Sequence, residues 1–152
     1  MTLLGKEDSN IKTRIISFLV LLFVIAGCSS NNPKLSEVNS VTLECIQSCL
    51  MQDNPPFNIK NFDDRKSISL FVKAINKGKR MKGSLDYAAV FLMTFNMENE
   101  ERKQYHLNIM NTERSQIGMY LKLPNTETGY KLSKKTSERL KKLIYESNIK
   151  GH

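Results

Sequence analysis

The sequence predicts an α+β fold: a small antiparallel sheet of about four strands with two helices packed on one face, in the order β-α-β-β-β-α. Two observations lead to this prediction. Apolar and polar residues alternate over several short segments, which is the period of a strand with one buried face. Two other segments carry apolar residues at helical spacing, and amphipathic helices bury such stripes against a sheet.

Four segments have the alternation of a half-buried strand. They are residues 38–46, 90–97, 105–110 and 117–123. The side chains expected to face the core are Val41, Leu43, Cys45, Phe91, Met93, Phe95, Met97, Tyr105, Leu107, Ile109, Ile117, Met119, Leu121 and Leu123. Polar links at 99–104 and 111–116 are short enough to join the last three segments as an antiparallel meander. The two prolines of "DNPPFN" (53–58) require a loop after the first strand.

Residues 62–80 contain the clearest helical pattern of the chain. The apolar stripe, at spacings i, i+3, i+4 and i+7, consists of Ile68, Phe71, Val72 and Ile75. Either Asp63 or Asp64 is expected to cap the N-terminus of this helix. Gly78 suits the position just after its last turn.

A second helix is expected near the end of the chain. Residues 130–132 form a short extended piece before it, and Ser133 is a natural N-cap. Its buried stripe consists of Leu140, Leu143 and Ile144. The length of this part favours one domain, so residues 38–152 are expected to fold as a single α+β domain.

The N-terminus has the pattern of a secretion signal. Lys12 and Arg14 precede an apolar stretch, residues 15–27. As a helix this stretch covers about 20 Å, which is short of the roughly 30 Å core of a bilayer. The tetrapeptide "IAGC" (25–28) that ends it resembles the lipobox of bacterial lipoproteins. That resemblance implies cleavage before Cys28, a diacylglycerol thioether on its sulfur and an acyl chain on its new amino group.

The predicted signal peptide is therefore residues 1–27. It contains three cations and two anions, so its removal lowers the formal net charge from +8 to +7. Residues 28–37 are mostly small and polar, and we expect them to form the lipidated N-terminus and a flexible tether. The expected location is the extracytoplasmic side of the cell membrane, in a Gram-positive bacterium, held by lipid on Cys28.

Several stretches of the chain carry a family resemblance. They are the lipobox, "ISLFVKAINKGKRMKG" (68–83), "YHLNI" (105–109) and "TGYKLSKKTSERLKKLI" (128–144). Together they resemble the YhfM-like lipoproteins of Bacillus and its relatives, over most of residues 62–146. The resemblance implies a secreted, membrane-anchored domain, and this family has no established activity that could be carried over.

Cys45 and Cys49 are the thiols that remain once Cys28 is assigned to lipid. In an extended strand their Cα atoms would lie about 13 Å apart, whereas a turn brings them to about 6 Å, at the edge of disulfide geometry. The pair is therefore either a local disulfide or two free thiols. A third interpretation is a redox or copper-handling site, with Met51 as an additional soft ligand.

The sequence contains no pattern that predicts catalysis. It has no Gly-x-Ser-x-Gly, no glycine-rich phosphate loop and no cluster with metal-ligand spacing. His106 lies on a predicted strand, and the sequence nominates no nucleophile or carboxylate as its partner. We therefore expect a protein that is not an enzyme and that carries no cofactor and no metal.

Cations are concentrated in the two predicted helices. Those of the second helix that we select as a candidate patch for anionic surfaces are Lys134, Lys135, Arg139 and Lys142. The first helix and its exit add Lys73, Lys77, Lys79, Arg80 and Lys82. If both helices cover one face of the sheet, the outside of that layer is positive, although solvated faces of two amphipathic helices explain the same residues.

The expected partners are those found outside a cell. They are anionic lipid headgroups, a cell-wall polymer or another envelope protein, and nucleic acid is excluded because the domain is exported. The sequence thus predicts a non-catalytic binding or accessory module of the cell envelope. The alternative function is redox or copper handling through Cys45 and Cys49.

Overall fold

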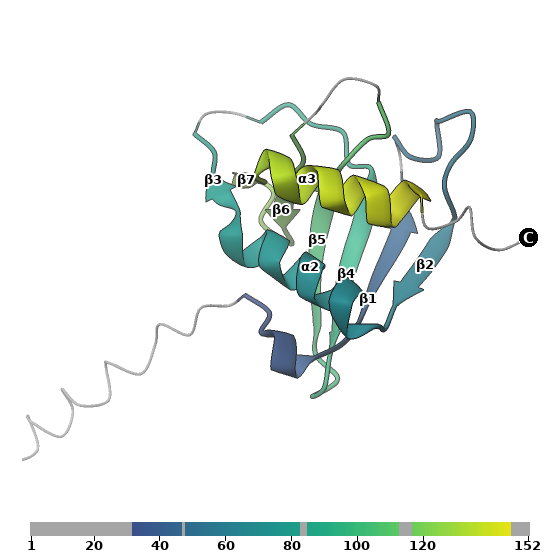
Figure 1. Cartoon of the computed structure of the whole chain (residues 1–152). Helices are drawn as coiled ribbons and strands as arrows, with labels where there is room; N and C mark the ends of the chain where they lie inside the picture. Colours follow the sequence, from purple (N-terminus) through teal and green to yellow (C-terminus); the bar gives the residue numbers. More distant parts are fainter. Residues whose placement is uncertain (1–31, 47, 83–84, 113–116, 147–152) are drawn as a thin grey trace, which may run out of the picture. The chain divides into compact units, whose positions relative to one another are not determined.

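The computed structural model describes residues 32–46, 48–82, 85–112 and 117–146 (Figure 1). The predicted signal peptide, Cys28 and residues 29–31 lie outside these residues. Among the described residues, no helix has the length and apolar character needed to cross a membrane.

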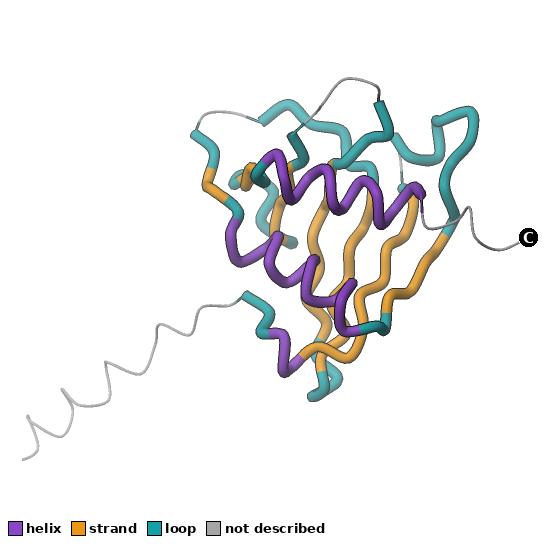
Figure 2. Tube along the Cα trace, viewed as in Figure 1, coloured by secondary structure: helices purple, strands orange, loops and turns teal. Residues whose placement is uncertain are grey.

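The described residues form one seven-stranded antiparallel sheet in the order β2-β1-β4-β5-β6-β7-β3. The strands are β1 (Val38–Cys45), β2 (Ile59–Phe62), β3 (Lys79–Arg80), β4 (Phe91–Met97), β5 (Arg102–Asn108), β6 (Met119–Lys122) and β7 (Gly129–Lys131). The helices are α2 (Arg65–Lys77) and α3 (Lys134–Lys141). Two shorter elements are the helical turn η2 (Leu35–Glu37) and the π-helix η3 (Lys142–Glu146), which continues α3. Figures 1 and 2 show α2 and α3 crossing the same face of the sheet.

The predicted fold class is confirmed in its coarse form, and the predicted number of strands is wrong. The sheet has seven strands rather than about four, because β2, β3 and β7 lie at its two sides. β2 has four residues with one buried side chain, and β3 has two exposed residues. Such short strands carry too little alternation to stand out in a sequence, since pairing with a neighbour defines them.

The face beneath the helices holds the hydrophobic core. The predicted inward residues of β1, β4 and β5 are all buried, as the alternation requires. From the helices, the apolar stripe of α2 is buried completely, and Leu140 and Ile144 are buried while Leu143 packs at the margin. Burial of these side chains is the main favourable contribution to folding.

The predicted inward face of β6 is wrong. Tyr120 lies opposite Leu107 in the sheet and is buried under the helices, whereas Ile117 is 43% exposed. Leu121 is also buried, but it pairs with His106 on the opposite face. Because adjacent strand residues point to opposite faces, two consecutive buried residues leave the register of this strand undefined by alternation alone.

Side-chain hydrogen bonds fix the start of each helix. Asp64, one of the two predicted caps, accepts a bond from the backbone N–H of Ser67 at 2.9 Å. The predicted cap Ser133 accepts from the N–H of Thr136 at 3.1 Å. The buried hydroxyl of Ser137 accepts a bond from the N–H of Gly118 at 2.9 Å, which joins α3 to the segment that enters β6.

The described part of the predicted tether, residues 32–37, is hydrogen-bonded to α2. The Asn76 amide donates to the carbonyl of Pro33 at 3.1 Å, and the Arg65 guanidinium donates to the carbonyl of Leu35 at 2.8 Å. The compact unit begins at Asn32 and contains the complete core. These contacts join residues far apart in the chain, and local composition does not reveal them.

Gly78 ends α2 with an ordinary backbone, at φ −61° and ψ 136°. A Cβ at this position would lie less than 3.0 Å from Cε1, Cζ and the hydroxyl oxygen of Tyr120. The hydroxyl of Tyr120 donates to the carbonyl of Ile75 at 2.6 Å. The glycine is therefore required by the close approach of Tyr120 to the end of α2, and not by a left-handed conformation.

We predict that Gly78→Ala lowers the free energy of unfolding by about 1–3 kcal/mol, the usual cost of overpacking. The added methyl group displaces the Tyr120 ring and weakens its bond to Ile75. Urea denaturation followed by circular dichroism measures the change. Lys77→Ala, at an exposed neighbouring position, is the control and should change stability little.

Candidate functional site

The helical layer presents cations on its outer side. In α2 the exposed cations are Lys66, Lys73 and Lys77. The second and third follow Lys66 by seven and by eleven residues, close to two and three helical turns, so all three lie on one side of the helix. In α3 and η3, Lys135, Arg139 and Lys142 are exposed at spacings of four and seven. Both sets lie opposite the buried stripes of their helices.

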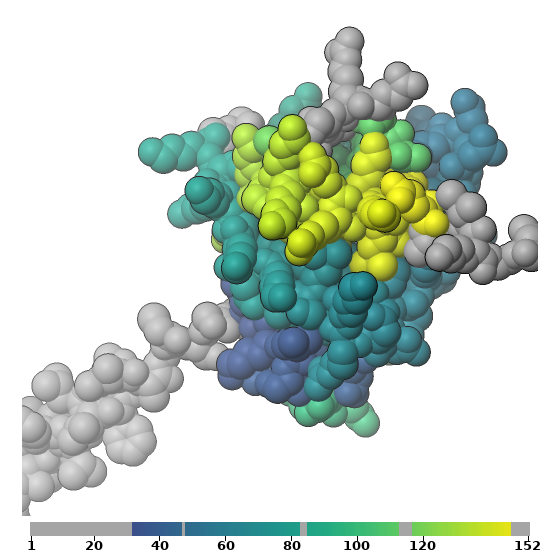
Figure 3. Space-filling view, viewed as in Figure 1, coloured from purple at the N-terminus to yellow at the C-terminus, as the bar shows by residue number. Residues whose placement is uncertain are grey.

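We call these six residues the cationic helix face. Figure 3 shows the side chains of α2 and α3 covering this side of the molecule. Lys142 lies 4.0 Å from Glu146 in an exposed pair, which contributes little energy. Within the ranges that the structure describes, the other five have no carboxylate within salt-bridge distance, so their charge is available to a ligand.

The structure separates the residues that the sequence analysis grouped together. Of the predicted patch, Lys135, Arg139 and Lys142 share one stripe, whereas Lys134 lies on the side of Lys141, whose ammonium donates to the carbonyl of Thr112. Lys79 belongs to β3 rather than to the helix exit, and it pairs with Lys131 of β7. Lys66 was not among the predicted cations, although it completes the stripe of α2. Its spacing of seven residues from Lys73 could have placed it on the same side of the helix.

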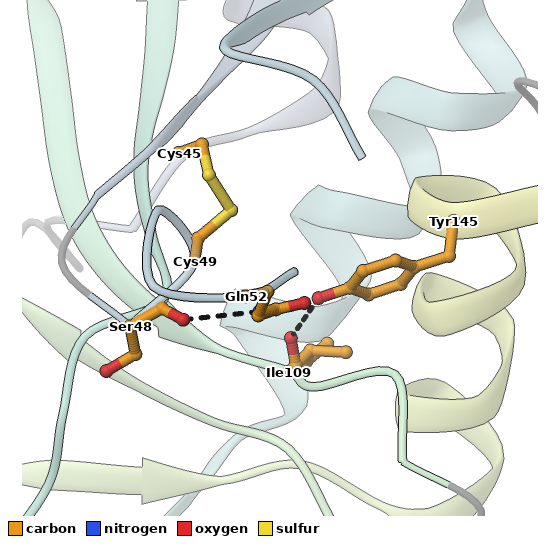
Figure 4. The surroundings of a disulfide bond; sticks show 6 residues. All are labelled: Cys45, Ser48, Cys49, Gln52, Ile109 and Tyr145. Atoms are coloured by element: carbon orange, nitrogen blue, oxygen red, sulfur yellow. Dashed lines mark hydrogen bonds between the residues drawn. A yellow bond between two sulfur atoms is a disulfide. The ribbon is translucent and has the colours of Figure 1, made fainter. Parts of the chain in front are cut away.

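Cys45 and Cys49 are joined by a disulfide, with their Cα atoms 5.3 Å apart (Figure 4). The bond closes a turn that follows β1, in which the N–H of Cys49 donates to the carbonyl of Ile46 at 2.8 Å. Both cysteines are buried, Cys49 completely. Met51 is 87% exposed, so the turn does not direct its sulfur toward the cysteines as the metal interpretation requires.

The turn is attached to the end of the helical layer. Gln52 donates to the carbonyl of Ser48 at 3.4 Å, and its side chain also bonds the hydroxyl of Tyr145. That hydroxyl donates in turn to the carbonyl of Ile109 at 3.0 Å (Figure 4). Burial raises the pKa of Tyr145, so the phenol stays protonated and keeps its donor. Among the described residues, no group of three or more metal-binding side chains is present.

His106 lies on the sheet face opposite the helices. Its Nδ1 is 2.9 Å from the hydroxyl of Tyr87, and the neighbouring Asn108 donates to the carbonyl of Ala88 at 2.9 Å. Both bonds hold the segment before β4 against this face. Partial burial lowers the pKa of His106, which favours the neutral ring. The contacts of His106 are therefore those of a histidine that positions a chain segment.

Polar side chains of β1, β2 and β4 on that face are hydrogen-bonded to one another, whereas Leu92 and Leu121 lie beside His106. Asn96 donates to the hydroxyls of Ser40 at 2.9 Å and Thr42 at 3.1 Å, and Thr42 donates to Asn61 at 3.2 Å. The two sides of the molecule thus differ in chemistry: one is cationic and helical, and the other is a largely uncharged sheet surface.

A two-layer α+β domain with a cationic helical layer and a disulfide-closed turn is the class of protein that these observations define. The chain matches the family model described as YhfM protein over residues 43–150, and it belongs to this family. The family resemblance predicted from the sequence is thereby confirmed.

Two further comparisons add no residue role. Among curated proteins, none matches the chain. Among solved structures, the chain is similar to a thioesterase-like protein from Clostridium sporogenes, with 14% sequence identity and a TM-score of 0.49. The similarity covers 74% of this chain and 98% of that one, and we transfer no property from it.

We predict that the Cys45→Ser/Cys49→Ser variant stays folded and loses about 2 kcal/mol of stability, because the bond constrains a loop of only about five residues. Urea denaturation measures the loss. Thiol titration of the denatured wild-type chain should detect two additional thiols after reduction. A pair found reduced in the native protein would contradict the structural role, and a stoichiometric Cu(I) complex would in addition support copper handling.

We predict that stability falls as the pH is lowered from about 7 through the ordinary histidine pKa of 6.5. The pKa of His106 is lowered in the folded protein, so on acidification the unfolded chain binds a proton at this histidine before the folded protein does. The loss of stability levels off once His106 is protonated in the folded protein as well. His106→Gln removes this part of the dependence. Denaturation between about pH 5 and about pH 8 measures it, and an unchanged pH profile would assign the effect to other groups.

Proposed function

We propose that this protein is a non-catalytic module, lipid-anchored through Cys28 on the extracytoplasmic side of the membrane, that binds phosphate-bearing polyanions of the cell envelope. The observation that carries the proposal is the cationic helix face. Its six exposed cations come from two helices that are packed side by side on one face of the sheet. The tetrapeptide ending at Cys28 supports the anchor.

The two features reinforce each other physically. An anchor of two or three acyl chains holds the domain stably at the bilayer surface, where the cationic helix face meets anionic groups at high local concentration. Each lysine or arginine near an anionic membrane surface contributes about 1 kcal/mol of binding energy. The cations also lie on a rigid layer, because α2 and α3 are fixed by buried side chains and by their N-caps. Little backbone conformational entropy is therefore lost when they bind.

The alternative of redox or copper chemistry has less support. The sulfur atoms of Cys45 and Cys49 belong to buried residues, and a redox partner or a metal must reach a thiol to react with it. The cationic face, in contrast, is exposed over its whole length. We therefore assign the disulfide to the stability of the turn and the helix face to binding.

We predict that Lys135→Gln/Arg139→Gln/Lys142→Gln weakens binding of the domain from Asn32 onward to phosphatidylglycerol vesicles roughly 100-fold, from three contributions of about 1 kcal/mol. Co-sedimentation at physiological salt measures the affinity. Phosphatidylcholine vesicles should bind neither protein.

The matched control is Lys79→Gln/Lys82→Gln/Lys131→Gln, which removes the same charge from exposed positions on and near β3 and β7. It should retain most of the binding, because interactions beyond about 8 Å are screened at this salt concentration. If both triple variants lost vesicle affinity equally, binding would depend only on the net charge of the domain. The cationic helix face would then not be the binding site.

A further inference from the structure

The turn after β1 exposes two adjacent apolar side chains. Leu50 is 57% exposed and Met51 is 87% exposed. Each would gain on the order of 1.5–3 kcal/mol on full transfer to an apolar environment. Together they offer apolar surface to a partner at the tip of a turn.

The turn holds these side chains outward in a fixed conformation. Its base is closed by the Cys45–Cys49 disulfide, and the N–H of Gln52 donates to the carbonyl of Cys49 at 3.2 Å. The bond from Gln52 to Ser48 adds a second closure across the same residues. Because the turn is braced, presenting Leu50 and Met51 to a partner costs little conformational entropy.

The apolar pair adjoins the cationic helix face. Gln52, the next residue after Met51, lies against Tyr145 in η3 (Figure 4). Tyr145 in turn follows Lys142 by three residues, within one turn of the helix. The turn thus lies next to the Lys142 end of α3 and η3, at one end of the cationic helix face.

We propose that the Leu50–Met51 turn inserts into the apolar region of an anionic phospholipid bilayer while the cationic helix face binds the headgroups. This inference rests on the proposed function and names its partner. A cell-wall polymer offers phosphate groups to the cations but no hydrocarbon for the two apolar side chains. A bilayer with anionic headgroups offers both, which is the usual arrangement at the membrane interface.

The chain supplies its own reporter position and a matched control. It contains no tryptophan, so a single introduced tryptophan reports its surroundings without background. Met51→Trp places it at the tip of the turn. Leu35→Trp places it at another exposed apolar position, 37% exposed, before β1. The eight residues of β1 separate the two sites by about 26 Å.

The experiment measures tryptophan emission of both variants, in the domain from Asn32 onward, during titration with phosphatidylglycerol vesicles. We expect a blue shift, and quenching by brominated acyl chains, for Met51→Trp and neither for Leu35→Trp. Vesicle binding without a shift at position 51 would overturn the insertion and leave the proposed function intact. Absence of vesicle binding in the wild-type domain would overturn the insertion, and absence of binding to soluble polyglycerol phosphate as well would overturn the proposed function too.

A second comparison separates the bilayer from a polymer. Leu50→Ser/Met51→Ser should weaken vesicle binding by about tenfold or more, and Leu35→Ser should not. Binding of both variants to soluble polyglycerol phosphate should equal that of the wild type, because this polymer meets only the cations. Vesicle affinity that is unchanged by Leu50→Ser/Met51→Ser would overturn the insertion and leave binding to headgroup phosphates alone.

Discussion

The structure depends on the burial of one face of an antiparallel sheet beneath two helices. That single constraint makes β1, β4 and β5 alternate between core and solvent, and it directs the apolar stripes of α2 and α3 inward. Their polar stripes must then point outward, and in this chain most of the charged residues at those positions are lysine and arginine, with Glu138 and Glu146 among them. The cationic helix face is thus a direct consequence of how the core is covered.

Close contacts at the ends of the helices fix the layer on the sheet. Tyr120 packs against Gly78 and bonds the last turn of α2, while Ser137 bonds the segment that enters β6. The turn after β1 is tied to η3 through Gln52 and Tyr145. A surface built from rigid elements can hold cations and apolar side chains in a constant relative position, which suits recognition of a membrane interface.

The opposite face of the sheet has a different character. Its threonine, serine and asparagine side chains satisfy one another, and the segment held by His106 and Asn108 covers part of it. Cations are not gathered into a stripe there, and Lys79 and Lys131 lie together at its edge. Under the proposed function, this difference between the two faces orients the domain with its helices toward the charged surface.

The sequence by itself determined the inward faces of β1, β4 and β5, the stripes and caps of both helices, and the family, because each depends on local periodicity or local motifs. Only the tertiary structure decided what depends on contacts between distant residues: the pairing of β2 and β3, the burial of Tyr120, and the docking of Pro33 on Asn76. It also decided which cations share a surface, since Lys66 and Lys135 lie 69 positions apart in sequence and join one face through packing of α2 against α3.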